Sequence, residues 1–235
     1  MTVDDIMAYL EEKGSDQTKS IYLKHGAPEP FFGVKVGDLK PIQKKLKKNL
    51  SIALELYKTG NSDAMYLAGL IADESQITKE QLQVWAEQAS WYMISEYAVA
   101  WTAADSPYGW ELGLEWIDSP KEHIASAGWA TLSNWLMVTP NDELDINEIK
   151  TLMERASAHV HEDENRVSYT MNGFIIAAGG QIPELTQVAR NLGDTIGKVN
   201  VQMGSTNCKV PVISEYVKKM EQRGNIGKKR KTARC

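Results

Sequence analysis

A carboxylate and several aromatic rings share one short stretch near the middle of the chain. The segment 90–104 reads SWYMISEYAVAWTAA and contains Trp91, Tyr92 and Glu96. Because residues four apart lie on the same side of a helix, the Tyr92 ring and the Glu96 carboxylate are expected to share one face. An aromatic platform beside a carboxylate can hold a purine or its sugar while the carboxylate stabilises developing positive charge. Glu96 is therefore the candidate catalytic residue.

Tryptophan is concentrated around this stretch. All seven tryptophans fall between Trp85 and Trp135, and the chain has nine Tyr but only three Phe. Trp and Tyr rings carry a polar group as well as an apolar surface. The clustering favours a central concave surface that some of these rings line. The alternative stays open, because core packing explains any one ring taken alone.

Basic residues form two groups in a chain whose net charge is −5. Residues 218–235 carry +7, so residues 1–217 carry −12, and a second basic run lies at 33–49. Such patches can bind polyanions locally, although a solvated helix face and a disordered tail are the alternative. The polar loop 203–209 can clasp a phosphate or serve only as a connection. The predicted phosphate-binding residues are Lys44, Lys45, Lys47, Lys48, Lys209, Lys228, Lys229, Arg230 and Lys231.

Several enzyme classes are excluded by missing signatures. The chain has no Walker loop, no G-x-G-x-x-G after a strand, no G-x-S-x-G elbow and no Cys/His dyad spacing. His159 and His161 precede acidic residues, but an i, i+2 pair does not converge on one face of a helix. Two cysteines are too few for a thiolate cage. No metal and no cofactor are expected.

Helical periodicity extends over nearly the whole chain. Apolar residues recur at i, i+3, i+4 and i+7, and Thr2 and Thr78 stand where helix caps are expected. Helices are predicted at, among others, 90–104, 107–117, 120–138, 146–160, 164–178, 182–196 and 210–223. About a dozen helices with short connections predict an all-α fold, an α-α superhelix of HEAT/ARM-like helical repeats. A compact, irregular helical bundle is the alternative.

Domain organisation follows from the same pattern. Residues 1–223 are predicted to form a single HEAT-like-repeat domain, and 224–235 a basic C-terminal tail with the composition of a mobile terminus. Asp105 and Asp118 each stand in a D-S-P sequence between helices, and N-capping through the Asp or the Ser is the interpretation. No apolar window is long enough to span a membrane, and the N-terminus lacks a signal peptide. The expected location is the cytoplasm.

The segment 22–48, YLKHGAPEPFFGVKVGDLKPIQKKLKK, resembles the N-terminal signature of the AlkD-like DNA alkylation repair proteins. In that signature an aromatic-Gly-Val/Ile step leads into a basic helix. The stretches 87–101, 166–180 (RVSYTMNGFIIAAGG) and CKVP…GKKRKTARC are also similar to a branch of this family. The resemblance implies a superhelix of HEAT-like repeats with a basic concave surface for duplex DNA. It also implies excision of cationic N3- and N7-alkylated purines, which the family's characterised glycosylases perform without flipping the base into a pocket.

The resemblance also implies an altered site. The family's glycosylases carry a Trp-Trp-Asp-x-x-Asp-type motif, whose last Asp stabilises the oxocarbenium-like sugar. Trp91 matches the first Trp, Tyr92 replaces the second, and Glu96 replaces that Asp. A DNA-contacting Arg falls on Ser126, and a further cleft Trp falls on Gly173.

The leading hypothesis is therefore a monomeric protein that binds double-stranded DNA and retains weak glycosylase activity. The alternatives are a non-catalytic module for distorted DNA or a protein partner, and a protein–protein solenoid with incidental basic patches.

Overall fold

The computed structural model describes residues 1–234, in which every regular element is a helix. The α-helices are α1 (Val3–Lys13), α2 (Asp16–Lys24), α3 (Val36–Leu46), α4 (Leu50–Lys58), α5 (Ser62–Ile71), α6 (Lys79–Gln88), α7 (Ala100–Asp105), α8 (Gly109–Trp116), α9 (Glu122–Val138), α10 (Ile146–His159), α11 (Asn165–Gln181), α12 (Thr186–Ile196) and α13 (Ile213–Gln222). A π-helix, η1 (Met93–Val99), continues directly into α7, and η2 (Asn141–Glu143) and η3 (Pro183–Leu185) are short 3-10 helices. The all-α prediction is confirmed.

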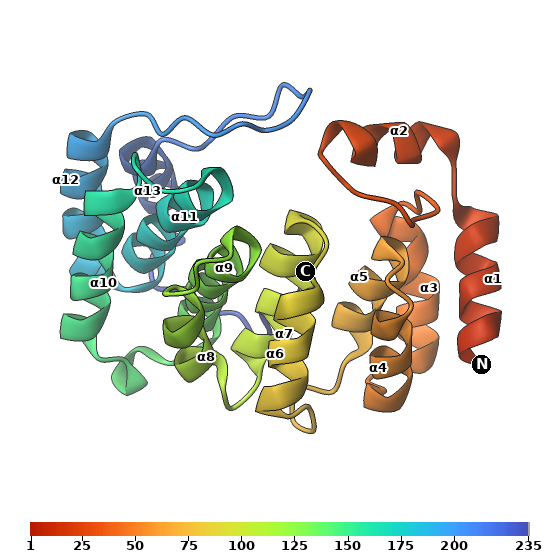
Figure 1. Cartoon of the computed structure of the whole chain (residues 1–235). Coiled ribbons are helices and arrows are strands. Elements are labelled where there is room, and N and C mark those ends of the chain that lie inside the picture. The colour runs from red at the N-terminus through yellow and green to blue at the C-terminus, as the bar shows by residue number, and fades with distance from the viewer. Residues whose placement is uncertain (235) are drawn as a thin grey trace.

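The helices form an arc of two rows (Figure 1). The inner row consists of α3, α5, η1 with α7, α9, α11 and α13, and each of these packs on the next. The outer row consists of α4, α6, α8, α10 and α12, each packed on an inner helix. Every residue of α5 is buried, whereas α10 and α12 bury only one stripe. This alternation of inner and outer helices is the pattern of an α-α superhelix.

Local sequence determines where several helices begin. Thr2 and Thr78 each form a reciprocal capping box, with Asp5 and Gln81 as their partners. The Asn61 side chain accepts hydrogen bonds from two backbone N–H groups at the start of α5, and this residue separates α5 from α4. Such bonds join residues that are near in sequence, so the pattern alone is sufficient to predict them.

The inner row depends on a close approach between α5 and η1. A Cβ atom on Gly69 would lie 2.6 Å from the Ala98 Cβ and 2.7 Å from the Ala98 Cα, closer than two carbon atoms can pack. We therefore expect Gly69→Ala to lower the free energy of unfolding by about 1–3 kcal/mol. Gly173→Ala in α11 is the matched control, since no atom lies within 4 Å of its added Cβ. The free energy of unfolding of Gly173→Ala should rise by up to about 1 kcal/mol. Urea unfolding of both variants tests this, and equal effects would contradict it.

A long non-helical connection, residues 197–212, joins α12 to α13 and reaches towards α2 (Figure 1). At its tip the Ser205 N–H donates to the Lys24 carbonyl at 3.0 Å. Gly204 beside it has a φ of +69°, and its Cβ would lie 2.1 Å from the same oxygen. Both the backbone conformation and the close approach require glycine at this position. The connection therefore links the last repeats to the first.

Residues 225–234, here called the strap, pack across the inner row. The Gly227 N–H donates to the Gly180 carbonyl at the end of α11, and the Arg230 N–H donates to the Met137 carbonyl near the end of α9, both at 2.8 Å. Further along, Ala233 is completely buried in the hydrophobic core. The segment predicted as a mobile tail is thus packed against the repeats.

The end of the strap is bound to α7 and to the end of α5. Asp105, the last residue of α7, accepts hydrogen bonds from the Thr232 hydroxyl at 2.5 Å and from the Ala233 N–H at 2.8 Å. Arg234 binds the end of α5 and the turn that follows it. The C-terminal ends of α11, α9, α7 and α5 therefore lie along one line, where unpaired carbonyls and helix dipoles attract a basic segment.

Of the two D-S-P sequences, the serines and not the aspartates bind the turns that lead into the next helices. The Ser106 hydroxyl accepts the Tyr108 N–H and the Ser119 hydroxyl accepts the Lys121 N–H, both at 3.2 Å. Asp105 instead binds the strap, and Asp118 forms an ion pair with Arg155 at 2.6 Å. Both carboxylates serve contacts between distant parts of the chain.

Candidate functional site

Glu96 lies in the π-helix η1 and forms a bidentate ion pair with Arg166. The Arg166 Nε donates to Glu96 Oε1 at 2.7 Å, and its Nη2 donates to Oε2. The Glu96 side chain is 4% exposed and the Arg166 side chain is 15% exposed. Arg166 belongs to the first turn of α11, and its backbone N–H donates to the Glu122 carboxylate at 2.6 Å. The pair therefore joins η1 to α11 across the start of α9.

The charge of Glu96 is balanced within the site. Burial raises the pKa of the Glu96 carboxyl, and Arg166 opposes this rise through its hydrogen bonds and its charge. Because a guanidinium in a protein stays protonated, the pair consists of an ionised carboxylate beside a cation. A positive charge developing nearby would meet this neutral pair rather than a free carboxylate.

Two tyrosine rings hold the Arg166 guanidinium between them. Its central carbon lies 4.4 Å from the ring centre of Tyr92 and 4.3 Å from that of Tyr169. The Tyr92 hydroxyl forms a hydrogen bond with His25 Nδ1 at 3.2 Å, and Arg166 Nη1 donates to the Met203 sulfur at 3.6 Å. The site thus combines the residue that follows α2, η1 with the residue before it, α11 and the connection 197–212.

A hollow of about 250 Å³ opens beside this pair on the inner row. It is lined by Glu96, Tyr97, Trp101, Tyr169, Gly173 and Arg230, among others. The Tyr97 and Trp101 rings meet edge to face with their centres 5.3 Å apart, and burial raises the pKa of Tyr97 to about 12. The space beside Gly173 is open. Aromatic faces around an open space suit a base or a sugar.

A larger cleft, of about 840 Å³, lies between α3 and the strap. Its basic lining residues are Lys40, Lys44, Lys47, Lys48, Lys231 and Arg234. Lys45 does not line it, although it belongs to the same helix. Its charge acts instead on Asp5 of α1, whose pKa is lowered chiefly by hydrogen bonds from Thr2 and to a lesser extent by Lys45.

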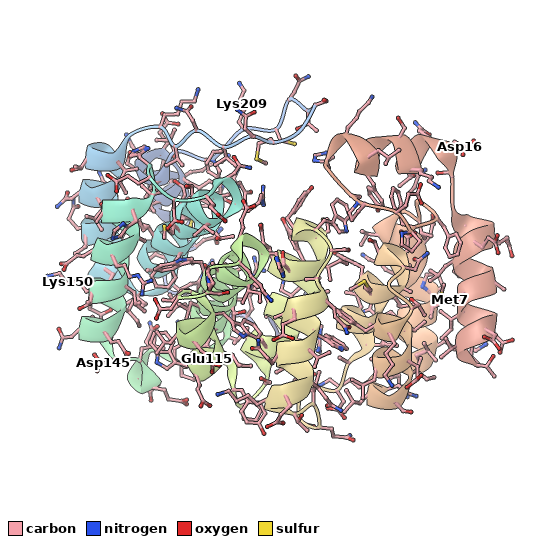
Figure 2. The ribbon with its side chains drawn as sticks, in the orientation of Figure 1. Met7, Asp16, Glu115, Asp145, Lys150 and Lys209 are labelled. Carbon is pink, nitrogen blue, oxygen red and sulfur yellow. The ribbon has the colours of Figure 1, made fainter. Side chains whose placement is uncertain are left out.

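The remaining predicted phosphate contacts lie apart from this cleft. Lys228, Lys229 and Arg230 border a separate hollow beside α13. The Lys229 Nζ donates a hydrogen bond to the Leu136 carbonyl at 2.7 Å, so this side chain helps to attach the strap to α9. Burial lowers the pKa of Lys229 to about 8. Lys209 is exposed on the connection 197–212 (Figure 2). The structure thus divides the predicted basic residues among several surfaces.

A model of the DNA alkylation repair enzyme family matches residues 6–189. The chain belongs to this family. Among its relatives, the uncharacterised protein Lin0241 of Listeria innocua is 32% identical over 231 residues, which cover 96% of this chain and 100% of that protein. The uncharacterised protein Lmo0209 of Listeria monocytogenes is 32% identical over 229 residues, which cover 95% and 99% of the two chains.

A solved structure shows the same fold over the whole length. It represents a new family of proteins related to the HEAT-like repeat DNA glycosylases, with affinity for branched DNA structures. The two chains share 35% identity and align with a TM-score of 0.91, each covered completely. The HEAT-like-repeat prediction and the resemblance to the alkylation repair family are confirmed.

The structure separates the residues that the family motif placed together. Trp91 is 8% exposed and packs between the Tyr22 and Tyr92 rings, at 5.5 and 5.1 Å between ring centres, so it points into the core. Ser126 is buried beside Glu96, and its hydroxyl donates to the His123 carbonyl at 3.3 Å. Of these positions, Glu96 and Gly173 line the hollow.

Sequence reasoning missed Arg166 and Tyr169. Arg166 stands in the first turn of α11, where a positive charge opposes the helix dipole. An arginine at such a position, opening an otherwise apolar helix, indicates a carboxylate partner elsewhere in the fold. That signal was present in RVSYTMNG, but nothing local identified Glu96 as the partner.

Within residues 1–234, no group of three or more His, Cys, Asp or Glu side chains is arranged to hold a metal ion. None of the helices described there is long and apolar enough to cross a membrane. Cys208 is a free, exposed thiol, and Cys235 lies outside the described residues.

Proposed function

We propose that this protein binds DNA at branch points and does so without a catalytic carboxylate. The ion pair between Glu96 and Arg166 carries this proposal, because a guanidinium already occupies both carboxylate oxygens. A glycosylase carboxylate must be free to stabilise positive charge on the sugar. Family membership and the likeness to a protein with affinity for branched DNA structures support nucleic acid as the ligand.

The phosphate contacts are assigned to exposed basic side chains. The exposed lysines are Lys44 of α3, Lys47 and Lys48 directly after it, Lys231 of the strap and Lys209 of the connection 197–212. Lysines contact phosphates as point charges and carry no sequence information. A binding surface of this kind recognises the course of the DNA backbone, which is what distinguishes a branch from a linear duplex.

Gel-shift titration with a synthetic four-way junction and a linear duplex of the same length tests this function. We expect the protein to bind the junction more tightly than the duplex. For both DNAs the logarithm of the binding constant should fall linearly with the logarithm of the salt concentration. Equal affinity for both DNAs, or no binding at low salt, would contradict the proposal.

Residual excision of alkylated purines is the second candidate function. The hollow beside Glu96 favours it, since Tyr97, Trp101 and the open space at Gly173 can receive a nucleotide. The assay is release of 7-methylguanine from methylated duplex DNA, with Glu96→Gln as the control. We expect no release above that control, and clear release by the unaltered protein alone would restore Glu96 as a catalytic residue.

A further inference from the structure

The strap separates two surfaces of the inner row. Arg230 lines the hollow beside Glu96, whereas its neighbour Lys231 lines the cleft against α3. The backbone between the two surfaces is fixed, because the Arg230 N–H binds the Met137 carbonyl and the Ala233 N–H binds Asp105. A DNA segment in the hollow therefore cannot continue into the cleft without crossing the strap.

The cleft is positively charged because its acids are already occupied. Glu74 is paired with Lys48 and with Arg234, and Asp105 accepts two hydrogen bonds from the strap. Within residues 1–234, no salt bridge involves Lys40, Lys44, Lys47 or Lys231. These four ammonium groups are available to an anionic ligand from both sides of the cleft.

The spacing of the lysines suits a sugar–phosphate backbone. Lys40 and Lys44 lie four residues apart in α3 and therefore on one side of the helix, and Lys47, the residue that ends the helix, lines the same cleft. From Lys40 to the end of α3 at Leu46 the helix advances by roughly 9 Å, and Lys47 follows directly. One DNA strand advances by about 10 Å over three nucleotides, so successive lysines can meet phosphates of one strand.

We propose that the cleft between α3 and the strap binds the backbone of a second DNA arm, separate from the arm at the Glu96 hollow. This inference rests on the proposed function and specifies how a branch is recognised. Two surfaces on either side of a fixed partition fit two diverging arms, whereas a linear duplex can occupy only one of them.

The test compares two variants of the same helix. Lys44→Glu/Lys47→Glu reverses two charges in the cleft, and Lys45→Glu reverses one charge outside its lining. Both are measured against a four-way junction and a linear duplex, with thermal unfolding to verify the fold. A third variant, Lys231→Glu, reverses a charge on the strap side of the cleft.

We expect the double variant to bind the junction roughly tenfold more weakly, with a salt slope lower in magnitude by about 1.8. Binding of the linear duplex should weaken by a smaller factor, because a linear duplex can instead occupy the surface on the other side of the strap. Lys231→Glu should act in the same direction, and Lys45→Glu should leave both affinities near those of the unaltered protein.

The outcomes separate this inference from the proposed function. If the unaltered protein fails to prefer the junction, both are overturned. Two results would overturn only the second-arm site, provided that the unaltered protein prefers the junction. The double variant could lose affinity for the junction and the duplex by the same factor, or its affinities could equal those of Lys45→Glu.

Discussion

Replacing Arg166 by methionine is expected to lower the free energy of unfolding by about 3–5 kcal/mol, because the Glu96 carboxylate would remain buried without its counter-charge. The Glu96 side chain is 4% exposed, so water cannot replace the guanidinium. The two tyrosine rings that pack on Arg166 would also lose their cationic partner. Urea unfolding followed by tryptophan fluorescence measures the change.

The loss should depend on pH in a defined direction. Burial raises the pKa of Glu96, and removing Arg166 removes the charge that opposes this rise. The folded variant therefore takes up a proton more readily than its unfolded chain, so its stability falls as the pH rises above the ordinary pKa of a glutamate carboxyl. At acidic pH the neutral carboxyl is tolerated and the deficit shrinks.

Two further variants make the result specific. Arg190→Met breaks an ion pair with Glu221 whose side chains are 36% and 38% exposed, and it should cost less than about 1 kcal/mol. Arg166→Met/Glu96→Gln removes both charges of the buried pair and should recover part of the loss. A loss no larger than that of Arg190→Met would show that the Glu96 pair is not a buried charge contact.

Much of the scaffold could be predicted because its determinants are local. Capping boxes at Thr2 and Thr78 and the helical periodicity of apolar residues require only neighbours in sequence. The position of Glu96 beside aromatic rings also follows from one short segment. Its partner Arg166 lies 70 residues further on, and only the stacking of the repeats brings the two together.

The strap could not be predicted, because its binding partners are mainly backbone carbonyls at helix ends. Such carbonyls exist at the end of every helix, whatever its sequence. A Gly-rich, basic segment has the composition of a mobile tail until a row of helix ends is placed beside it. That Lys44 lines the cleft and Lys45 does not likewise depends on where the strap packs.

Arg234→Met is expected to release the end of the strap and to lower the free energy of unfolding by about 2–4 kcal/mol. The Arg234 Nε donates to the Gly69 carbonyl at 2.8 Å, its Nη2 to the Ala72 carbonyl at 3.0 Å, and its Nη1 to Glu74 at 2.8 Å. Its side chain is 8% exposed, so these three acceptors would lose a donor that water cannot easily replace.

Limited trypsin digestion identifies the release directly, because the strap contains basic residues at 228–231 that its packing protects. Cleavage there should be faster in Arg234→Met than in Arg223→Met, a change at an exposed arginine of the turn after α13. Arg234→Lys keeps the charge but cannot donate to three acceptors in the same fork geometry, so it should fall between the two. Equal cleavage rates in all three variants would mean that Arg234 does not hold the strap. The strap would then owe its position to the Asp105 and Ala233 contacts, and these would be the ones that separate the hollow from the cleft.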